Sequence, residues 1–256
     1  MRLKDKVIIV TGGTSGIGAA IATACVREGA QVLLHGINAD EGREVADRLG
    51  GAASLFLSDL NCPSAPVEIA RATLSKFGRI DGLVNNAALI EKSNITELTY
   101  EAYQRTMQVN LTAALFLIQA TFDELKKSRG SILNIGSVNA YAGESGLLAY
   151  SISKAGMQTM TRNLANANGI HGVRVNQINP GWVLTAREDR DRQATGFEEG
   201  WPLRLSRNDI PLGAMTTPEQ LAEAAIYWLG DESIPFTGTI LELEQFSIIG
   251  RNPEKL

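Results

Sequence analysis

Short apolar runs alternate along the chain with longer stretches in which apolar residues recur every three or four positions. The first run, residues 7–10, consists of β-branched residues, which is typical of a buried strand. The stretch 17–28 has the helical period and is followed by Gly29, a residue common just after a helix. A second apolar run at 31–35 completes a strand–helix–strand unit.

The same alternation continues through the rest of the chain. We expect further strands at 54–57, 82–84, 131–135, 174–178 and 239–243, and further helices at 41–49, 66–77, 100–125, from about 149 onward, and at 218–229. Strands that take turns with helices and are apolar almost throughout indicate a parallel sheet covered on both faces. We therefore predict one α/β domain over residues 1–256.

Composition narrows the class of protein. A chain of 256 residues with 44% hydrophobic and 20% charged residues can bury a substantial core. The net charge of −4 is spread along the chain, so we expect no nucleic-acid partner. No apolar run is long enough for a signal peptide or a membrane span. Cys25 and Cys62 fit a reducing compartment, and we expect a soluble, cytoplasmic protein.

A glycine-rich turn joins the first predicted strand to the first predicted helix. It reads TGGTSGIG at residues 11–18. Glycine permits close approach of the backbone to a pyrophosphate, and the helix N-terminus supplies unpaired N–H groups. The spacing is TGxxxGxG and not GxGxxG, and a merely structural turn is the alternative. Because a strand precedes the turn and a helix follows it, we favour a dinucleotide site.

Three side chains that can hold or move a proton lie on one short stretch. Ser137 follows the strand predicted at 131–135, Tyr150 comes 13 positions later and Lys154 another four. On a helix, Tyr150 and Lys154 lie one turn apart on the same face. A neighbouring ammonium favours the phenolate and lowers the pKa of the phenol toward neutral pH. The alternative is an ordinary packing tyrosine beside a solvated lysine. With only His35 and His171 in the chain, we expect no metal site.

Together these motifs resemble the short-chain dehydrogenase/reductase family. The resemblance is carried by TGGTSGIG at 11–18, NNAA at 85–88, Asn110, the set Ser137, Tyr150 and Lys154, and Pro180-Gly181 with Thr185. These features occur in the family's order along almost the whole chain. The resemblance implies a Rossmann-like, doubly wound sheet of about seven parallel strands with helices on both faces. It also implies a nicotinamide cofactor, no metal and usually a homotetramer.

The resemblance implies catalytic roles for four residues. Tyr150 would exchange a proton with the substrate oxygen, and Ser137 would hydrogen-bond that oxygen. Lys154 would lower the pKa of Tyr150 and hold the nicotinamide ribose. Asn110, at an expected interruption of its helix, would position a water molecule next to Lys154. The alternative for Asn110 is an amide that is hydrogen-bonded to backbone within the helix.

The resemblance also implies a cofactor site. Its residues would be Gly12, Ser15, Gly16, Ile17, Gly18, Ile37, Asp59, Leu60, Asn86, Ala87, Tyr150, Lys154, Pro180, Gly181, Val183 and Thr185. After the second strand, Gly36 stands where an acid would bind the ribose 2′-hydroxyl, and Ile37 where an arginine would bind a 2′-phosphate. This series is similar to that of hydroxybutyrate-type members that use NAD. We therefore favour NAD over NADP, while Asn38 or His35 could still serve a 2′-phosphate.

Substrate contacts are expected from two parts of the chain. Residues 182–212 would form a lid, and the implied substrate residues are Ser137, Asn139, Glu144, Tyr150 and Trp182. The lid is rich in arginine, which suits carboxylate or phosphate groups: Arg187, Arg190, Arg192, Arg204 and Arg207. Pairing with the lid's own acids is the favoured alternative for any one of them. The two polar residues near Ser137 favour a sugar, polyol or hydroxy acid.

Two departures from the family pattern stand out. NNAA replaces the usual NNAG, a mild change if φ is negative at Ala88. Glu244-Gln245-Phe246 replaces a DGG-like turn, which puts the details of the tetramer and of specificity in doubt. The C-terminal tail is 244–256, and its last part, 248–256, either extends onto a neighbouring subunit or ends loosely.

Two classes of function are compatible with these features. The first is an NAD(P)-dependent oxidoreductase that interconverts a secondary alcohol and a ketone, with a 3-oxoacyl-thioester reductase as the second substrate class. The second is a non-catalytic member that senses nucleotide or binds a protein. The complete set of Asn110, Ser137, Tyr150 and Lys154 favours the enzyme, because a sensor has no need of all four groups.

Overall fold

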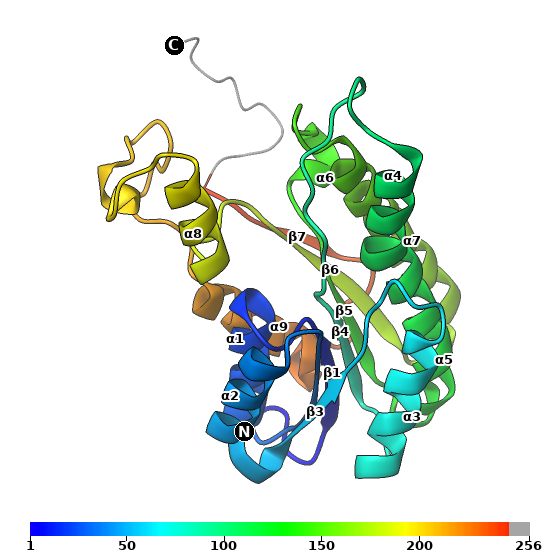
Figure 1. Cartoon of the computed structure of the whole chain (residues 1–256). Coiled ribbons are helices and arrows are strands. Elements are labelled where there is room, and N and C mark those ends of the chain that lie inside the picture. The colour runs from blue at the N-terminus through cyan, green and yellow to red at the C-terminus, as the bar shows by residue number, and fades with distance from the viewer. Residues whose placement is uncertain (246–256) are drawn as a thin grey trace.

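One parallel sheet of seven strands runs through the computed structural model, which describes residues 1–245 (Figure 1). The strands are β1 Val7–Thr11, β2 Gln31–Gly36, β3 Ala53–Leu57, β4 Gly82–Asn85, β5 Ser131–Ile135, β6 Arg174–Pro180 and β7 Ile240–Leu243. Their order in the sheet is β3-β2-β1-β4-β5-β6-β7. The winding reverses between β1 and β4, which confirms the predicted doubly wound α/β fold. In such sheets ligands bind outside the carboxyl ends of the strands, where the winding reverses.

Helices cover both faces of the sheet, with α1, α2 and α9 on one side and α3, α5 and α7 on the other (Figure 1). The helices are α1 Gly16–Arg27, α2 Ala39–Leu49, α3 Ala65–Phe77, α4 Tyr100–Met107, α5 Ala113–Ser128, α6 Asn139–Ala142, α7 Leu148–Asn168, α8 Ala186–Ala194 and α9 Pro218–Leu229. Among residues 1–245, none of them has the length and apolar character that crossing a bilayer requires.

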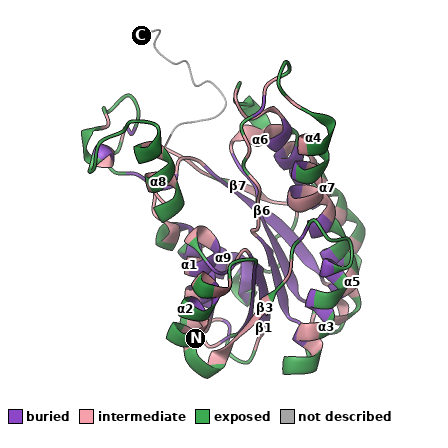
Figure 2. Cartoon of the chain, viewed as in Figure 1, coloured by how far each residue is buried: buried purple, intermediate pink, exposed green. Residues whose placement is uncertain are grey.

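Alternation along the strands divides the apolar residues between two cores. Ile8 and Val10 of β1 pack in the cluster beneath α1 and α9, whereas Ile9 packs in the cluster beneath α3 and α5. All three side chains are fully buried, and burial of each contributes roughly 1.5–3 kcal/mol. Figure 2 shows the strands buried between the two helical layers.

The structure has one helix interruption that was predicted and two helices, α6 and α8, that were not. The helix predicted at 100–125 is interrupted by a π-helical turn at Gln108–Thr112, with Asn110 at its centre. An additional helix, α8, lies in the predicted lid and was not predicted. Its sequence, AREDRDRQA, is polar on every side, so apolar periodicity could not reveal it. Thr185 begins α8, because its Oγ1 accepts a hydrogen bond of 3.0 Å from the Glu188 N–H.

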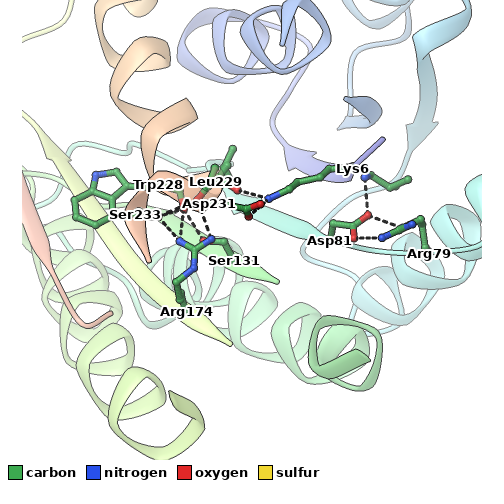
Figure 3. A network of polar contacts seen from close by, with 11 residues as sticks. Lys6, Arg79, Asp81, Ser131, Arg174, Trp228, Leu229, Asp231 and Ser233 are labelled. Carbon is green, nitrogen blue, oxygen red and sulfur yellow. Dashed lines mark hydrogen bonds and ion pairs between the residues drawn. The ribbon is translucent and has the colours of Figure 1, made fainter. Parts of the chain in front are cut away.

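A buried arginine ties the end of α9 to the edge of the sheet opposite the strand carboxyl ends (Figure 3). The Arg174 guanidinium donates to the Trp228 carbonyl at 2.8 Å, to the Gly230 carbonyl at 3.0 Å and to the Ser233 hydroxyl. Ser131 Oγ donates to the same Trp228 carbonyl at 2.8 Å. These donors satisfy carbonyls that the helix terminus itself leaves unpaired.

Acidic side chains make similar connections to β1 (Figure 3). The Asp81 carboxylate accepts the Val7 backbone N–H at 2.8 Å and pairs with Arg79 at 2.6 Å. Lys6 Nζ lies 2.5 Å from Asp231 Oδ1. The first strand is therefore joined at its amino end to the segments that precede β4 and follow α9.

Replacing Arg174 by methionine should destabilise the fold. The change leaves buried carbonyls at the end of α9 without their donor, and each such loss costs about 1–3 kcal/mol. We expect the free energy of unfolding to fall by about 3 kcal/mol, measured by urea denaturation. Arg162→Met, at an exposed position of α7, is the matched control and should change stability by less than about 0.5 kcal/mol. Equal effects of the two substitutions would contradict this role of Arg174.

Candidate active site

The glycine-rich turn after β1 is packed closely against the NNAA segment. Gly12 has a φ of 62°, in the left-handed region that favours glycine. A Cβ at Gly12 would lie 2.9 Å from Asn86 Nδ2, and a Cβ at Gly18 would overlap the Gly12 carbonyl. Both positions therefore require glycine for steric reasons. The turn presents backbone, and not side chains, at the carboxyl end of β1.

The start of α1 can bind an anion. The helix begins at Gly16, followed by Ile17, and its first N–H groups have no partner within the helix. Ser15 is exposed and extended, and its side chain does not cap the helix. Unpaired N–H groups together with the positive end of the helix dipole suit phosphate. The residues present therefore fit the pyrophosphate of a dinucleotide.

Hydrogen bonds hold the NNAA segment against this turn. Asn86 Nδ2 donates to the carbonyls of Thr11 and Gly12 at 2.9 and 3.1 Å. Thr11 Oγ1 accepts the N–H groups of Asn86 and Ala87 at 3.0 and 3.1 Å. Within residues 1–245, positive φ outside glycine occurs at Asp5 and Arg129, so φ at Ala88 is negative and the change from NNAG is mild.

The predicted adenosine residues follow β2 and β3. Ile37 is 76% exposed, and Leu60 is buried. Asp59 is exposed, and its Oδ1 accepts the Asn61 N–H at 2.9 Å. Because β2 and β3 are neighbours in the sheet, these residues lie at one end of the row of strand termini.

The other predicted cofactor residues follow β6, at the opposite end of that row. The carbonyl of Pro180 accepts the Val138 N–H at 3.1 Å, and the N–H of Gly181 donates to the Leu243 carbonyl at 3.0 Å. Val183 forms an isolated bridge with Thr216. Thr185 caps α8, and its Cγ2 lies 3.5 Å from the position of a Cβ on Gly16. The segment after β6 thus reaches the start of α1.

Tyr150, Lys154 and Ser137 come together at the start of α7. Tyr150 and Lys154 lie one turn apart, and the Lys154 Nζ is 5.6 Å from the centre of the Tyr150 ring. Ser137, just after β5, lies close enough to the Tyr150 side chain to lower its pKa, and its Oγ accepts the Asn139 N–H at 3.1 Å. All three are at least nine-tenths buried. Their proximity excludes the alternative of a packing tyrosine beside a solvated lysine.

Burial determines the pKa values of this pair. It raises the pKa of Tyr150, and the charge of Glu144 acts in the same direction, while the hydrogen bond with Ser137 lowers it. Burial lowers the pKa of Lys154 to about 8. The Lys154 Nζ donates to the Ile135 carbonyl at 2.7 Å. The pKa of Tyr150 is thus raised and not lowered as expected, because in the protein by itself desolvation outweighs any effect of Lys154.

Asn110 is fully buried in the π-helical turn, so the predicted interruption of the helix at this residue is confirmed. Its Oδ1 accepts the Leu89 N–H at 2.7 Å, and its Nδ2 donates to the Leu89 carbonyl and to Ser153 Oγ, both at 3.0 Å. Ser153 Oγ in turn donates to the Tyr150 carbonyl at 2.6 Å. Asn110 therefore connects the loop after β4 to the helix that carries Tyr150. A role in positioning water stays a prediction.

The predicted substrate residues fall into two groups. Asn139 lies in α6, and its Nδ2 donates to Glu144 Oε2 at 3.2 Å, so these two polar side chains lie next to each other near Ser137. Trp182 instead belongs to the lid. Its indole N–H donates to Glu188 Oε1 at 2.7 Å, and its ring stacks on Trp201 with 5.4 Å between centres.

The lid 182–212 packs around a small apolar core that also includes a residue just after it. Its centre is formed by Trp201, Ile210 and Met215, with Trp182, Leu184 and Leu205 packed against it. Figure 2 shows that α8 is mostly exposed around this core. The predicted pairing of lid arginines with lid acids is confirmed for three of them: Arg187 with Asp191, Arg192 with Glu188, and Arg204 with Glu198.

Asn179 was not singled out from sequence, whereas Glu244 was noted only as part of a departure from the family pattern. Asn179 Oδ1 accepts the Ser137 backbone N–H at 3.1 Å. Glu244 lies against Gly181, where a Cβ would overlap its carboxylate. The sequence signal for Asn179 is its polarity, shared with Gln177, on alternate positions of a strand that is buried throughout. Of the segment Glu244-Gln245-Phe246, the last residue lies outside the described residues, as does the tail from 246 to 256.

Comparisons with known proteins agree with this geometry. A family model described as short chain dehydrogenase matches residues 6–196. L-fucose dehydrogenase of Mus musculus is 36% identical over 245 residues, which cover 93% of this chain and 86% of that protein. The NADP-dependent (R)-specific alcohol dehydrogenase of Lentilactobacillus kefiri is 33% identical over 243 residues, covering 93% and 94%. L-rhamnose 1-dehydrogenase (NAD(P)(+)) of Azotobacter vinelandii is 31% identical over 250 residues, covering 94% and 96%.

The family model spans well over half of the chain, and the residues it covers include the glycine-rich turn, NNAA, Ser137, Tyr150 and Lys154. The relatives cover more than nine-tenths of the chain. The fold with its reversal between β1 and β4 is the one that the sequence motifs imply. This protein therefore belongs to the short-chain dehydrogenase family.

Proposed function

We propose that the protein interconverts a secondary alcohol and a ketone of a small polar substrate, with Tyr150 as the acid/base. As a short-chain dehydrogenase, the chain is an NAD(P)-dependent oxidoreductase that acts on CH–OH groups. The observation that carries the proposal is the buried cluster of Ser137, Tyr150 and Lys154. Ser137 follows β5 and the dinucleotide turn follows β1, so both lie at the carboxyl edge of the same parallel sheet.

The nicotinamide ring, when bound, supplies or accepts the hydride, and the protein supplies orientation and one proton. In the oxidation direction, Tyr150 takes the hydroxyl proton of the substrate. In reduction it returns that proton to the substrate oxygen. Ser137 donates to the same oxygen and keeps it next to the phenol. Because burial opposes the phenolate, Tyr150 requires a nearby positive charge when it acts as a base.

Lys154 is suited to supply this charge. Its ammonium has three N–H donors, and one of them is used by the Ile135 carbonyl. The remaining donors can hold the hydroxyls of the nicotinamide ribose. With a pKa of about 8, a substantial fraction of the lysine is protonated at neutral pH. We assign to Asn110 the support of Tyr150 through Ser153 and, as the family resemblance implies, a water next to Lys154.

We favour NAD as the cofactor because residues 36–38, directly at the end of β2, offer no cation for a 2′-phosphate. A Cβ at Gly36 would lie 2.5 Å from Thr14 Oγ1, which keeps this position small. Ile37 is apolar and exposed. The Asn38 side chain caps α2 by accepting two backbone N–H groups. His35 is buried with Nε2 3.0 Å from the Ser58 carbonyl, and burial lowers its pKa, so it is poorly suited to bind phosphate.

We favour a neutral sugar or polyol within the class of small polar substrates. Four lid arginines already have partners, three of them acids and the fourth, Arg207, the Pro211 carbonyl at 2.9 Å. Asn139 and Glu144 offer hydrogen bonds suited to hydroxyl groups, and the carboxylate disfavours an anionic substrate such as a hydroxy acid. The L-fucose and L-rhamnose dehydrogenases among the relatives support this choice. A 3-oxoacyl-thioester reductase is the second candidate.

We also propose that the enzyme is a cytoplasmic homotetramer. Leu115 and Phe116 of α5 and Ile152 of α7 are each more than 40% exposed, although they are apolar. Burial against a second copy would remove these side chains from water. Cys25 and Cys62 are free, which fits a reducing compartment.

A substrate panel tests the proposed function. Purified protein is assayed by nicotinamide absorbance with NAD and NADP against aldoses, polyols, hydroxy acids and a 3-oxoacyl thioester. We expect turnover with at least one aldose or polyol and little or none with the thioester. Tight NADH binding with no turnover on the whole panel would contradict the enzyme and favour a nucleotide sensor.

Tyr150→Phe should abolish turnover while the cofactor still binds. Loss of the phenolic proton removes the acid/base, so kcat/KM should fall by at least about 10³-fold. The Kd for NADH, measured by fluorescence, should stay close to that of the wild type. Tyr100→Phe, at a position that is 72% exposed, is the control. A Tyr150→Phe variant as active as this control would remove the central assignment.

Ile37→Arg should shift the cofactor preference toward NADP. A guanidinium at this exposed position can pair with a 2′-phosphate, so the ratio of kcat/KM for NADP to that for NAD should rise at least about tenfold. Ile37→Gln has a similar length without the charge and should leave the ratio nearly unchanged. A wild-type enzyme that already prefers NADP would contradict the choice of NAD.

Lys154→Met should stabilise the fold while it inactivates the enzyme. At pH 7 the ammonium is charged in both the folded and the unfolded chain, and its lowered pKa of about 8, against an ordinary 10.5, corresponds to a burial cost of about 3 kcal/mol. The folded chain binds fewer protons between these values, so wild-type stability should rise from about pH 8 to 10.5 and the advantage of the variant should shrink. Urea denaturation at pH 7 and pH 10 measures this difference, and a variant less stable than the wild type at pH 7 would contradict it.

A further inference from the structure

A row of buried amide side chains crosses three strands beneath the candidate site. Asn85 of β4, Asn134 of β5 and Gln177 of β6 are neighbours in the sheet register, and all are buried. Asn85 Nδ2 donates to Asn134 Oδ1 at 2.9 Å, and Asn134 Nδ2 donates to Thr161 Oγ1 at 2.8 Å. Thr161 Oγ1, from α7, lies 2.9 Å from Gln177 Oε1. The row therefore joins the sheet to the helix that carries Tyr150.

Asn179 connects this row to Ser137. Its Oδ1 accepts two hydrogen bonds, from Gln177 Nε2 at 2.7 Å and from the Ser137 backbone N–H at 3.1 Å. Its Nδ2 donates to Gln158 Oε1 of α7 at 3.0 Å. Asn179 has no exposed surface, so water does not compete for these bonds. The Asn179 amide is thus hydrogen-bonded through both its oxygen and its nitrogen. Its oxygen binds Ser137, in the segment that follows β5.

The backbone N–H of Ser137 fixes the orientation of the Asn179 amide and, through it, that of Gln177. This N–H can only donate, so Asn179 must present its oxygen to it, and Gln177 must present its nitrogen to that oxygen. The Thr161 hydroxyl lies 2.9 Å from both the Gln177 Oε1 and the Met157 carbonyl. At the other end of the row, Asn85 Oδ1 is left without a partner among the described residues.

Steric packing shows how closely the amide approaches the chain at this point. A Cβ at Gly136 would overlap both Asn179 Oδ1 and Gln177 Nε2. The Cα of Gly136, directly before Ser137, is thus packed against the side-chain amides of Asn179 and Gln177. Displacement of Asn179 and displacement of Ser137 are coupled through this contact.

We propose that Asn179 is a positioning residue for Ser137: its amide oxygen holds the Ser137 backbone N–H and so keeps the hydroxyl of Ser137 at the Tyr150 phenol. The inference rests on the proposed function, in which these two hydroxyl groups share the substrate oxygen. Gln177 holds the amide oxygen from the other side, whereas Gln158 contacts only the amide nitrogen, which the proposed role does not use.

The positioning role of Asn179 predicts a change in the Tyr150 pKa, which a purely structural role of Asn179 would not cause. The groups that act on Tyr150 are Ser137, whose hydrogen bond lowers its pKa, Glu144, whose charge raises it, and Lys154, 5.6 Å from the ring. If Ser137 shifts away from the phenol, the Tyr150 pKa rises. Cofactor contacts at the glycine-rich turn are not part of this array and should be unaffected.

The test compares Asn179→Ala with Gln158→Ala in the full-length protein. Asn179→Ala should lower kcat by about 10- to 100-fold, because misplacement by about 1 Å at a reacting group has that effect. It should leave the Kd for NADH unchanged and raise the Tyr150 pKa. This pKa is measured by NMR from the pH dependence of the Tyr150 ¹³Cζ resonance, which is assigned because it is missing in Tyr150→Phe. Gln158→Ala removes the other partner of the same amide and should stay near the wild type in all three measurements.

A second variant covers the case in which Asn179→Ala does not fold. Gly136→Ala pushes the intact amide away from Ser137, and it should lower kcat and raise the Tyr150 pKa in the same way. The inference is overturned if the Asn179 or Gly136 variant that folds keeps the wild-type kcat and the wild-type Tyr150 pKa. It is also overturned if Gln158→Ala lowers kcat as much as Asn179→Ala does. Failure of the proposed function is distinguishable, because the wild type would then be inactive across the substrate panel whatever the Tyr150 resonance shows.

Discussion

Polar groups that are buried at the carboxyl ends of β4, β5 and β6 must be hydrogen-bonded, and this requirement positions the candidate site. An unpaired buried amide or ammonium is costly. Asn110 satisfies the backbone of Leu89, Asn179 satisfies the N–H of Ser137, and the Ile135 carbonyl accepts from Lys154. Two of these bonds attach a proposed catalytic element to a strand, and the Asn110 bond attaches one to the loop after β4. These bonds to the buried core restrict the positions of the site residues.

The same burial creates the chemical problem that the proposed cofactor would help to solve. Desolvation raises the pKa of Tyr150 and lowers that of Lys154 to about 8, so on the protein alone the neutral phenol is favoured. Both shifts reflect a site that excludes water, in which charge interactions are strong. With the proposed substrate and ribose bound, the Lys154 ammonium would stabilise a Tyr150 phenolate beside it. Stability is given up for this arrangement, as buried charge at a functional position commonly implies.

Sequence periodicity and glycine placement were sufficient to predict a parallel sheet covered on both faces, the order of its elements along the chain and the proximity of Tyr150 to Lys154 on one helix, whereas the doubly wound sheet was implied by the family resemblance. They could not predict α8, because a helix that is polar on every side has no apolar period. They could not predict the contact between Asn179 and Ser137 either, because it depends on the register of β5 against β6. The direction of the Tyr150 pKa was predicted wrongly, since spacing on a helix gives proximity to a charge but not the degree of burial.

A crystal structure of the protein with bound NADH tests the central claim most directly. The account predicts that the nicotinamide ring lies beside the hydroxyl groups of Tyr150 and Ser137, with room for a substrate oxygen within about 3 Å of both. It also predicts that the Lys154 ammonium reaches the adjoining ribose and that the pyrophosphate lies at the start of α1. A nicotinamide ring bound away from Tyr150, or a dinucleotide that does not contact the turn at 11–18, would contradict the account.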